Sequence, residues 1–393
     1  MLENRTSLRD TFYMIKKNFL FLSVFLLLAS LSYAQESTLR GFIFDAETGE
    51  IIPYSLVKLL ENNQGTYSDE TGLYNIPSIK VGDYSAVATA VGYDSSFVSV
   101  QFKNGEIKAQ NFYLKSTSKQ LKGVSINGEK LRKKKEVNIS QTTIKPIHLT
   151  RIPSVGGEPD LVQYLQVLPG VVFSGDQGGQ LYIRGGSPVM NKVILDGLTV
   201  YNPFHGIGLF SVFDSDILQS VDVYSAGFSS EYGGRISAIV DVKTRDGDKT
   251  KFRGKINISP FNSKLLLEGP LKKYEAGKGS SSVILSYKNS YLDKSAPIIY
   301  PYINDGNLPY SFSDLYGKIS FNAATGSSIN FFGFDYTDKV SFENSASYDW
   351  KSRGMGSKFL LIPGSSKTII DGSSTFSNYL SQQREIDIKP RKS

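Results

Sequence analysis

The last third of the chain alternates apolar and polar residues, and this alternation predicts β-strands with one apolar face. The first such stretch places Phe252, Ile256 and Ile258 on one face and polar side chains on the other. The same alternation returns over residues 283–288 and 315–322. In a soluble sandwich the apolar face would form the core, whereas in a membrane barrel it would face lipid. Roughly seven such strands are expected after residue 250.

Two other patterns precede these strands. Residues 37–115 contain short apolar runs separated by turn residues, which predicts a small antiparallel β-sandwich of about seven strands. Residues 147–246 combine a short helix after Pro159 with apolar strands, of which 192–195 and 238–244 are the clearest. This second pattern predicts a compact α/β domain.

The N-terminus has the pattern of a secretory signal peptide over residues 1–34. Lys16 and Lys17 precede an apolar run of 13 residues, and the segment Ser32-Tyr33-Ala34 places small residues where signal peptidase cleaves. The run is short for a transmembrane helix, so a membrane anchor is the less favoured alternative. We expect cleavage after Ala34 and export to the envelope of a bacterium.

Composition narrows the chemistry that the chain performs. The 393 residues include no Cys, and the histidines are His148 and His205. Disulfides, Cys-ligated zinc, Fe–S clusters and thiol nucleophiles are therefore excluded. No catalytic series or phosphate loop stands out, so we predict no enzyme, no catalytic residue, no metal site and no cofactor. The basic run at 130–135 is interpreted as a solvated linker rather than a nucleic-acid site.

Residues 37–115 resemble the carboxypeptidase regulatory-like domain, a transthyretin-like β-sandwich. The resemblance rests on these segments: Gly41-x-x-x-Asp45, Thr48-Gly49-Glu50, Pro53, Thr66-x-x-Asp69-x-x-Gly72, Gly82-x-Tyr84 and Gly92-Tyr93. The sequence contains no zinc-ligand cluster of the peptidase kind. The resemblance therefore implies a structural or docking module.

Residues 147–246 resemble the plug domain of TonB-dependent outer-membrane receptors. The segments "LPGV", "IRGG", "VILDG" and "VDVYSAGFSSEYGGRISAIVDVKT" carry this resemblance by their order along the chain. With the regulatory-like domain in front, the arrangement is similar to receptors of the Bacteroidetes type. The plug segments depart from those of starch-utilisation-type glycan importers, which argues against a glycan substrate and against a surface lipoprotein partner.

The resemblance implies a mainly β fold made of three parts. These are an N-terminal transthyretin/Ig-like β-sandwich, a small α/β plug domain, and the first strands of an incomplete antiparallel transmembrane β-barrel at 250–393. Receptors of this kind resemble a barrel of about 22 strands around a plug. We therefore expect this sequence to be an N-terminal fragment with a truncated barrel.

The linker at 116–146 contains a candidate TonB box. In this family a short segment before the plug adds a strand to TonB, because main-chain hydrogen bonds require little of the sequence. The alternating segment 121–127 is the candidate, with the residues Leu121, Gly123, Val124, Ser125 and Ile126. The alternative interpretation is a last edge strand of the sandwich.

The plug motif supplies candidate structural and gating residues: Arg184, Gly185, Gly186, Asp196, Gly197, Tyr232, Gly233, Gly234 and Arg235. The three charged residues are expected to form salt bridges within the plug or to the barrel wall, because buried charges need partners. The glycines are expected to permit positive φ or close backbone approach.

Candidate substrate-facing residues lie in two loops: Asn202, Phe204, His205, Tyr300 and Tyr302. Solvated loops, and a surface histidine at His205, are the alternative interpretation.

The resemblance implies active uptake of a scarce nutrient, namely a siderophore, cobalamin, peptide or glycan. The implied partners are TonB with its inner-membrane complex and outer-membrane lipid, and no nucleic acid. The implied site is the outer membrane of a Gram-negative bacterium, with the sandwich and the plug entrance on the periplasmic side. The alternatives are a surface adhesion protein without transport and a signalling receptor.

Overall fold

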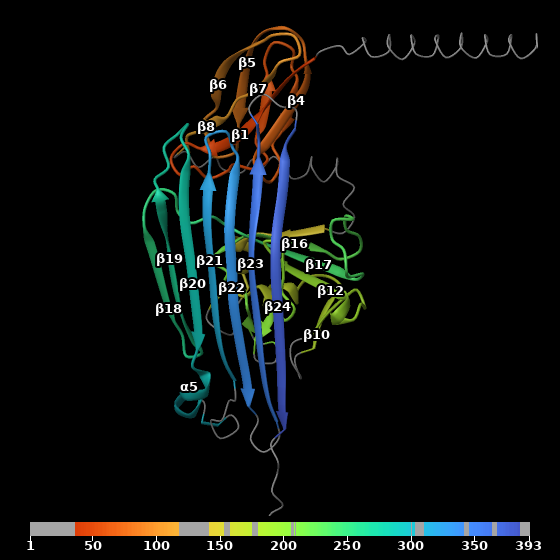
Figure 1. Cartoon of the computed structure of the whole chain (residues 1–393), viewed down its shortest axis with the longest axis vertical. Helices are drawn as coiled ribbons and strands as arrows, with labels where there is room; N and C mark the ends of the chain where they lie inside the picture. Colours follow the sequence, from red (N-terminus) through yellow and green to blue (C-terminus); the bar gives the residue numbers. More distant parts are fainter. Residues whose placement is uncertain are drawn as a thin grey trace, which may run out of the picture.

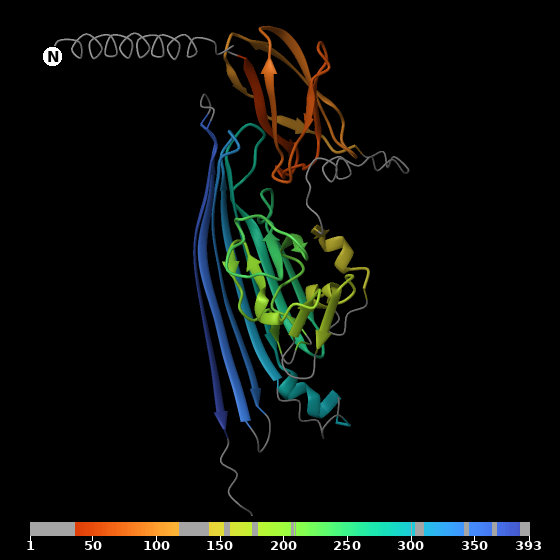
Figure 2. The ribbon, with the colours of Figure 1, turned by 90° about the vertical axis from the view of Figure 1, so that its right-hand side faces the viewer.

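The computed structural model describes residues 36–117, 141–152, 158–174, 180–205, 208, 210–299, 301–302, 310–341, 346–363 and 368–385. The predicted signal peptide, the candidate TonB box and Tyr300 lie outside the described residues. The described chain forms three parts: a small sandwich at one end, a long curved sheet, and a compact domain packed on one face of that sheet (Figures 1 and 2). No helix among the described residues is long and apolar enough to cross a membrane.

The N-terminal sandwich contains two sheets. Its strands are β1 (Ser37–Asp45), β2 (Leu56–Leu59), β3 (Gly65–Tyr67), β4 (Leu73–Ile79), β5 (Gly82–Thr89), β6 (Ser96–Phe102), β7 (Ile107–Ala109) and β8 (Phe112–Leu114). One sheet has the order β4-β1-β7 with β8 also on β1, and the other has the order β3-β2-β5-β6. The prediction of a purely antiparallel sandwich is wrong at one edge, where β7 and β8 run parallel to β1. They do so because the chain crosses over from the second sheet before it returns to β1.

The compact domain is built on a five-stranded sheet. Its elements are β9 (Gln141–Ile144), α3 (Pro146–Leu149), α4 (Leu161–Leu165), β10 (Val171–Ser174), β11 (Gln180–Ile183), η1 (Pro188–Met190), β12 (Asn191–Leu195), β13 (Leu198–Thr199), β14 (Phe204–His205), β15 (Phe210–Ser211), β16 (Leu218–Tyr224) and β17 (Ala238–Thr244). The order is β13-β12-β17-β16-β9, with β12 parallel to β17. Helix α4 begins after Asp160, whose carboxylate accepts hydrogen bonds from the backbone amides of Val162 and Gln163.

Strand β9 corrects the predicted linker boundary. Residues 116–146 are predicted to form a linker, but Gln141–Ile144 pair with β16 as the edge strand of the five-stranded sheet. The segment is short and polar, so its pattern alone resembles a loop. Pairing with the already folded β16 satisfies its backbone groups and makes it a strand.

The curved sheet, here called the wall sheet, consists of β18 (Arg253–Ile258), β19 (Asn262–Lys272), β20 (Ser280–Ser290), β21 (Tyr310–Asn322), β22 (Ser328–Ser341), β23 (Ala346–Leu361) and β24 (Ile370–Glu385). All seven strands pair antiparallel in chain order, so the described sheet is open, with β18 and β24 as its edges. Helix α5 (Leu292–Ile299) lies in the connection between β20 and β21. The predicted fold class and strand count are confirmed.

The two faces of the wall sheet differ as the alternation predicts. Ile256, Leu267 and Phe376 point away from the compact domain and are exposed. The opposite face packs on the compact domain and shares one apolar core with it. Ile284 and Tyr316 of the wall sheet belong to this core, and both are buried. This shared core fixes the compact domain against the sheet (Figure 2).

The sandwich docks on the end of the wall sheet that carries the short β21–β22 turn, opposite α5 (Figure 1). The Asn111 side-chain amide donates to the carbonyl of Ala324 in this turn at 2.7 Å, and Arg40 Nη2 donates to the carbonyl of Pro363 at 2.6 Å. Phe42 is buried, and its ring covers Gly326 of the same turn. The contact between the sandwich and the wall sheet therefore combines apolar packing of Phe42 with two side-chain hydrogen bonds.

We predict that Gly326→Ala loosens the sandwich from the wall sheet. A methyl group at Gly326 would lie 2.2 Å from the ring of Phe42, so the ring must leave its seat. The expected result is stronger hydroxyl-radical labelling of Phe42. Gly277→Ala is the matched control, because Gly277 also has a positive φ, of 77°, but has open space around it. Equal labelling in both variants would contradict the prediction.

Candidate functional site

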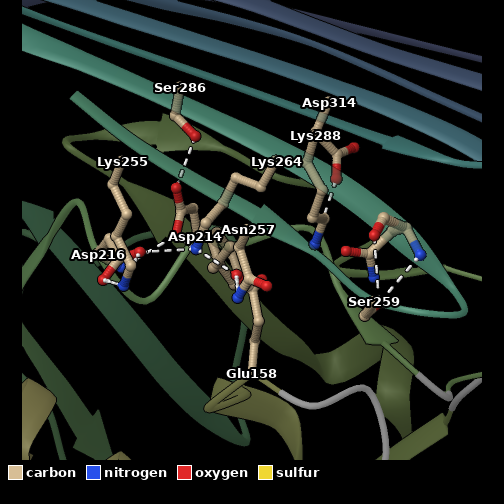
Figure 3. Close-up of polar contacts among 12 residues, drawn as sticks. Glu158, Asp214, Asp216, Lys255, Asn257, Ser259, Lys264, Ser286, Lys288 and Asp314 are labelled. Carbon is tan, nitrogen blue, oxygen red and sulfur yellow. Dashed lines mark hydrogen bonds and ion pairs between the residues drawn. The ribbon is translucent and has the colours of Figure 1, made fainter.

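The interface between the compact domain and the wall sheet gathers the largest group of buried charges in the described chain, and it is the candidate functional site. Lys264 of β19 lies at its centre with a side chain that is 1% exposed. Its ammonium group lies 2.8 Å from Glu158, 3.0 Å from Asp214 and 2.7 Å from Asp216 (Figure 3). Three carboxylates of the compact domain thus converge on one cation of the wall.

Neighbouring wall residues complete this ion cluster. Lys255 Nζ lies 2.9 Å from Asp216, and Ser286 Oγ donates to Asp214 at 2.6 Å. The side-chain amide of Asn257 donates to Glu158 at 2.5 Å. Figure 3 shows these side chains extending from the strands of the wall toward the loop that carries both aspartates. Every carboxylate of the cluster therefore has a partner on the wall.

The surroundings of Asp216 keep its carboxylate charged. Burial alone would raise its pKa, but hydrogen bonds and charges from Lys255 and Lys264 outweigh burial and hold the pKa of Asp216 below its ordinary value. A lowered pKa contributes stability that is present above the unfolded value of about 3.9 and is lost as the pH falls through the folded value. This part of the interface therefore persists at neutral pH.

A second ion cluster joins the end of β17 to the wall. Arg245 makes a two-pronged pair with Glu268 of β19, at 2.5 and 3.0 Å. Asp246 lies 3.4 Å from Lys318 and accepts a hydrogen bond from Ser320 at 2.7 Å. Burial would raise the pKa of Asp246, but the charges of Lys318 and Lys249 hold it well below its ordinary value.

Asp196 of the plug motif contacts the wall sheet through hydrogen bonds, whereas a salt bridge is expected from the sequence. Asp196 and Gly197 both have positive φ and form the two-residue turn between β12 and β13, a conformation that favours this Asp-Gly pair. The carboxylate accepts hydrogen bonds from Thr244 Oγ1 at 2.6 Å and from Tyr316 Oη of β21 at 2.8 Å. The expected salt bridge is thus replaced by hydrogen bonds from neutral groups.

The two arginines of the motif are exposed. Arg184 is exposed at the end of β11, with a φ of 48°, and its amide donates to the carbonyl of Gly170 at 2.7 Å. Arg235 is exposed, and its Nη1 donates to the carbonyl of Gly234 at 2.9 Å. The expected salt bridge of Arg235, within the plug or to the barrel wall, stays a prediction.

The remaining motif residues shape turns. Gly185 and Gly234 have positive φ, and a Cβ at Gly186 would lie 1.9 Å from Ser237 Oγ, which explains these three glycines. Gly233 meets neither condition, and its carbonyl instead accepts a hydrogen bond from Lys192 at 3.0 Å. Tyr232 donates to Asp241 of β17 at 3.0 Å. These residues hold the compact domain together rather than attaching it to the wall.

The candidate substrate-facing residues are mostly covered. Phe204 and His205 form β14 and are buried, so the interpretation of His205 as a surface residue is wrong. Asn202 is half-buried, and its side-chain oxygen accepts a hydrogen bond from the backbone amide of Phe204 at 3.2 Å. Of the predicted aromatic residues in the β20–β21 connection, Tyr302 is 78% exposed. Packing of the 202–205 loop against the wall, which local sequence does not show, accounts for the burial.

The sequence pattern does not single out the wall residues that carry the site. Lys264, Asp314 and Lys318 lie on the polar face of their strands, and the alternation already separates that face from the apolar one. That pattern shows that the face is polar, but it does not show which carboxylates of the compact domain meet it. Among the described residues, no group of three or more His, Cys, Asp and Glu is arranged to hold a metal ion.

Comparisons with known proteins agree with this architecture. A family model described as a CarboxypepD_reg-like domain matches residues 39–126, and one described as a TonB-dependent Receptor Plug Domain matches residues 133–239. The TonB-dependent transporter Oar of Myxococcus xanthus is 25% identical over 252 residues, which are 59% of this chain and 22% of the relative. The TonB-dependent receptor P3 of Formosa agariphila is 28% identical over 242 residues, which are 60% of this chain and 23% of the relative. The match thus spans less than a quarter of each relative.

Solved structures show weaker likeness. The siderophore receptor PirA from Pseudomonas aeruginosa has a TM-score of 0.41 and 15% identity, over 63% of this chain and 41% of that one. The copper transporter OprC has a TM-score of 0.41 and 12% identity, over 61% of this chain and 37% of that one. At these scores the likeness carries no argument about ligand or mechanism.

We predict that Lys264→Met destabilises the interface by about 3–5 kcal/mol, because it leaves buried carboxylates without their shared cation. The measurement is the urea dependence of hydrogen exchange in β17, whose residues Val240 and Val242 belong to the shared core. Lys278→Ala is the control, since Lys278 pairs with Glu275 on the open surface. An unchanged urea dependence for Lys264→Met would contradict the prediction.

Proposed function

Because the chain belongs to the TonB-dependent receptors, with a regulatory-like sandwich in front of the plug, we propose that it serves gated uptake of a scarce nutrient across the outer membrane. In this proposal the compact domain is the plug and the wall sheet is part of the barrel. The substrate comes from the classes already named: siderophore, cobalamin, peptide or glycan. Both curated relatives carry names of TonB-dependent transport or reception.

The observation that carries the proposal is the opposite character of the two faces of the wall sheet. Ile256 and Phe376 represent the exposed apolar face, which suits lipid. Lys264 and Lys318 represent the other face, which meets the plug through ion pairs and hydrogen bonds. A polar interface supports movement, because charged groups that separate are rehydrated, whereas separated apolar surfaces are not stabilised by water.

The proposed orientation places the sandwich and the plug entrance in the periplasm. The sandwich and the short turn at residues 323–327 share one end of the wall sheet, and α5 with its long connection lies at the other (Figure 1). Short turns on the periplasmic side and longer loops outside are typical of outer-membrane barrels. Arg353 and Asp335 form an ion pair at 2.7 Å on the outward face of the wall sheet, in the half of the sheet that lies nearer α5. Because charged side chains are costly in the hydrocarbon core, this pair suits a position in the headgroup region or above it.

Energy for the movement would come from the inner-membrane complex, which would act through TonB on the segment 121–127. The regulatory-like match ends at residue 126 and the plug match begins at residue 133, so the candidate box lies at the end of the regulatory-like match and ahead of the plug match. The first described strand beyond it is β9, the edge strand of the plug sheet. A pull on the linker would therefore reach the plug at β9, where Thr143 donates to the buried carboxylate of Asp222 at 2.6 Å.

We predict that Val124→Pro abolishes TonB-dependent uptake. Proline removes one backbone donor and blocks strand addition to TonB, while the folded domains stay intact. The measurement compares accumulation of labelled candidate nutrients in cells with equal amounts of receptor in the outer membrane. Lys134→Pro is the matched control in the same linker and is expected to keep uptake.

Two outcomes would contradict the transport proposal. One is uptake of every tested nutrient that is unchanged in Val124→Pro. The other is surface binding of a ligand that persists without any uptake in the unmodified protein, which would favour the adhesion alternative.

A further inference from the structure

His205 occupies an unusual place between the plug and the wall. It lies in β14, its side chain is completely buried, and its ring stacks on Phe312 at 4.1 Å and on Trp350 at 5.5 Å, nearly parallel to both. Phe312 belongs to β21 and Trp350 to β23, with β22 between them. One imidazole of the plug therefore fills the gap of two strand spacings, about 9.5 Å, between two wall aromatics.

The polar edge of the same ring meets two carboxylates. His205 Nε2 lies 2.8 Å from Asp314 of β21, and Nδ1 lies 3.4 Å from Asp338 of β22. Asp338 is paired in register with both Phe312 and Trp350, so the ring stands directly over this row of the wall. Asp314 lies within hydrogen-bond distance of Nε2, and Asp338 faces Nδ1 at a longer distance, so a negative charge lies beside each nitrogen. This arrangement favours the protonated ring over the neutral one.

The charges around the ring balance. Lys288 Nζ of β20 lies 3.5 Å from Asp314 and 5.2 Å from the Phe312 ring centroid. Two cations, His205 and Lys288, thus face two anions, Asp314 and Asp338. The other titratable groups near this site are Tyr336 of β22, which interacts with Asp314, and Tyr379 of β24, which interacts with Asp338 and packs on Trp350. Stacking between two aromatic faces further favours a cationic ring.

We propose that His205, as an imidazolium, is a proton-dependent latch that holds the β14–β15 hairpin of the plug against the barrel wall. Loss of the proton removes the charge that Asp314 and Asp338 bind and leaves two buried carboxylates with one cation, Lys288. The hairpin then separates from the wall more readily. The role of the latch in gating rests on the proposed function. The proton-dependent contact between His205 and the wall sheet does not, because it depends only on the residues of this chain.

The direction of the pH dependence follows from the balance around the ring. Burial would lower the pKa of His205, but the charges and hydrogen bonds of Asp314 and Asp338 outweigh burial and raise it. The latch is therefore complete below the unfolded pKa of about 6.5 and is lost as the pH rises through the folded value. Acid conditions close the latch, and alkaline conditions open it.

Trp350 supplies a direct reporter, because a protonated imidazole stacked on an indole quenches its fluorescence. The experiment records tryptophan emission against pH for the full chain in detergent micelles, and subtracts the emission of Trp350→Phe to isolate this residue. We expect emission to rise as the pH increases, with a midpoint above the ordinary histidine value of about 6.5. His205→Gln abolishes the step, and His148→Gln, which changes the other histidine of the sequence, keeps it.

A second variant separates a latch from simple packing. Asp338→Asn keeps the ring and its aromatic neighbours but removes one carboxylate, so the midpoint falls by about one pH unit, a tenfold change in proton affinity. Hydrogen exchange of β14–β15 amides, divided by the intrinsic base-catalysed rate at each pH, is expected to rise about tenfold from one pH unit below the midpoint to one unit above it, in proportion to the deprotonated fraction. Exchange in the five-stranded plug sheet, divided by the same intrinsic rate, stays unchanged and shows that the fold is intact.

The latch is overturned if the Trp350 signal has no step, or if the step survives His205→Gln. It is also overturned if hairpin exchange shows the same pH dependence in His205→Gln as in the unmodified chain. None of these measurements uses uptake or TonB. A failure of the transport proposal with an intact fluorescence step would therefore leave the proton-dependent contact standing, and the reverse result would remove only the latch.

Discussion

The structure depends on one constraint: a charged side chain that leaves water must find a partner of opposite charge. The inward face of the wall sheet carries Lys264, Lys318 and Asp314, all nearly inaccessible to solvent. Each meets an opposite charge at the plug interface, namely Asp216, Asp246 and His205. A plug displaced by one strand would leave several buried charges unpaired at once. The ion pairs therefore define the position of the plug more sharply than apolar contacts alone would.

Apolar packing and ion pairs contribute differently to the interface between the plug and the wall sheet. The shared core, to which Leu198, Tyr316 and Trp350 contribute, supplies the area that is removed from water. Such packing stabilises the interface but tolerates small shifts, because it has little directional preference. The ion clusters are directional and respond to protonation. In the proposed transport role, the plug would stay closed at rest and move during uptake, and both kinds of contact would contribute.

A series of ion pairs and hydrogen bonds also connects the sandwich to the plug. Glu70 of the sandwich lies 3.1 Å from Lys243 of β17, and Lys243 lies 3.0 Å from the buried Asp222 of β16. Asp222 in turn holds the edge strand β9 through Thr143. The sandwich, the plug sheet and the first strand after the linker thus share one hydrogen-bonded chain of side chains. A displacement of the sandwich at the wall rim would change the charge environment at the point where the linker enters the plug.

The amino-acid sequence by itself determined the strands of the wall, the sandwich and the central plug strands, because each is encoded by local alternation or by an apolar run bounded by turn residues. It also determined the Asp196–Gly197 turn, since both residues tolerate the positive φ that it requires. Tertiary structure alone decided the strand identity of Gln141–Ile144, the burial of His205 and the partners of Lys264. In each of these cases the deciding group lies far away along the chain, on β16, β21 or the loop of Asp214. The alternation of apolar and polar residues shows on which face of a strand a side chain lies. The partner of that side chain depends on how the compact domain packs against the wall sheet, which no local pattern encodes.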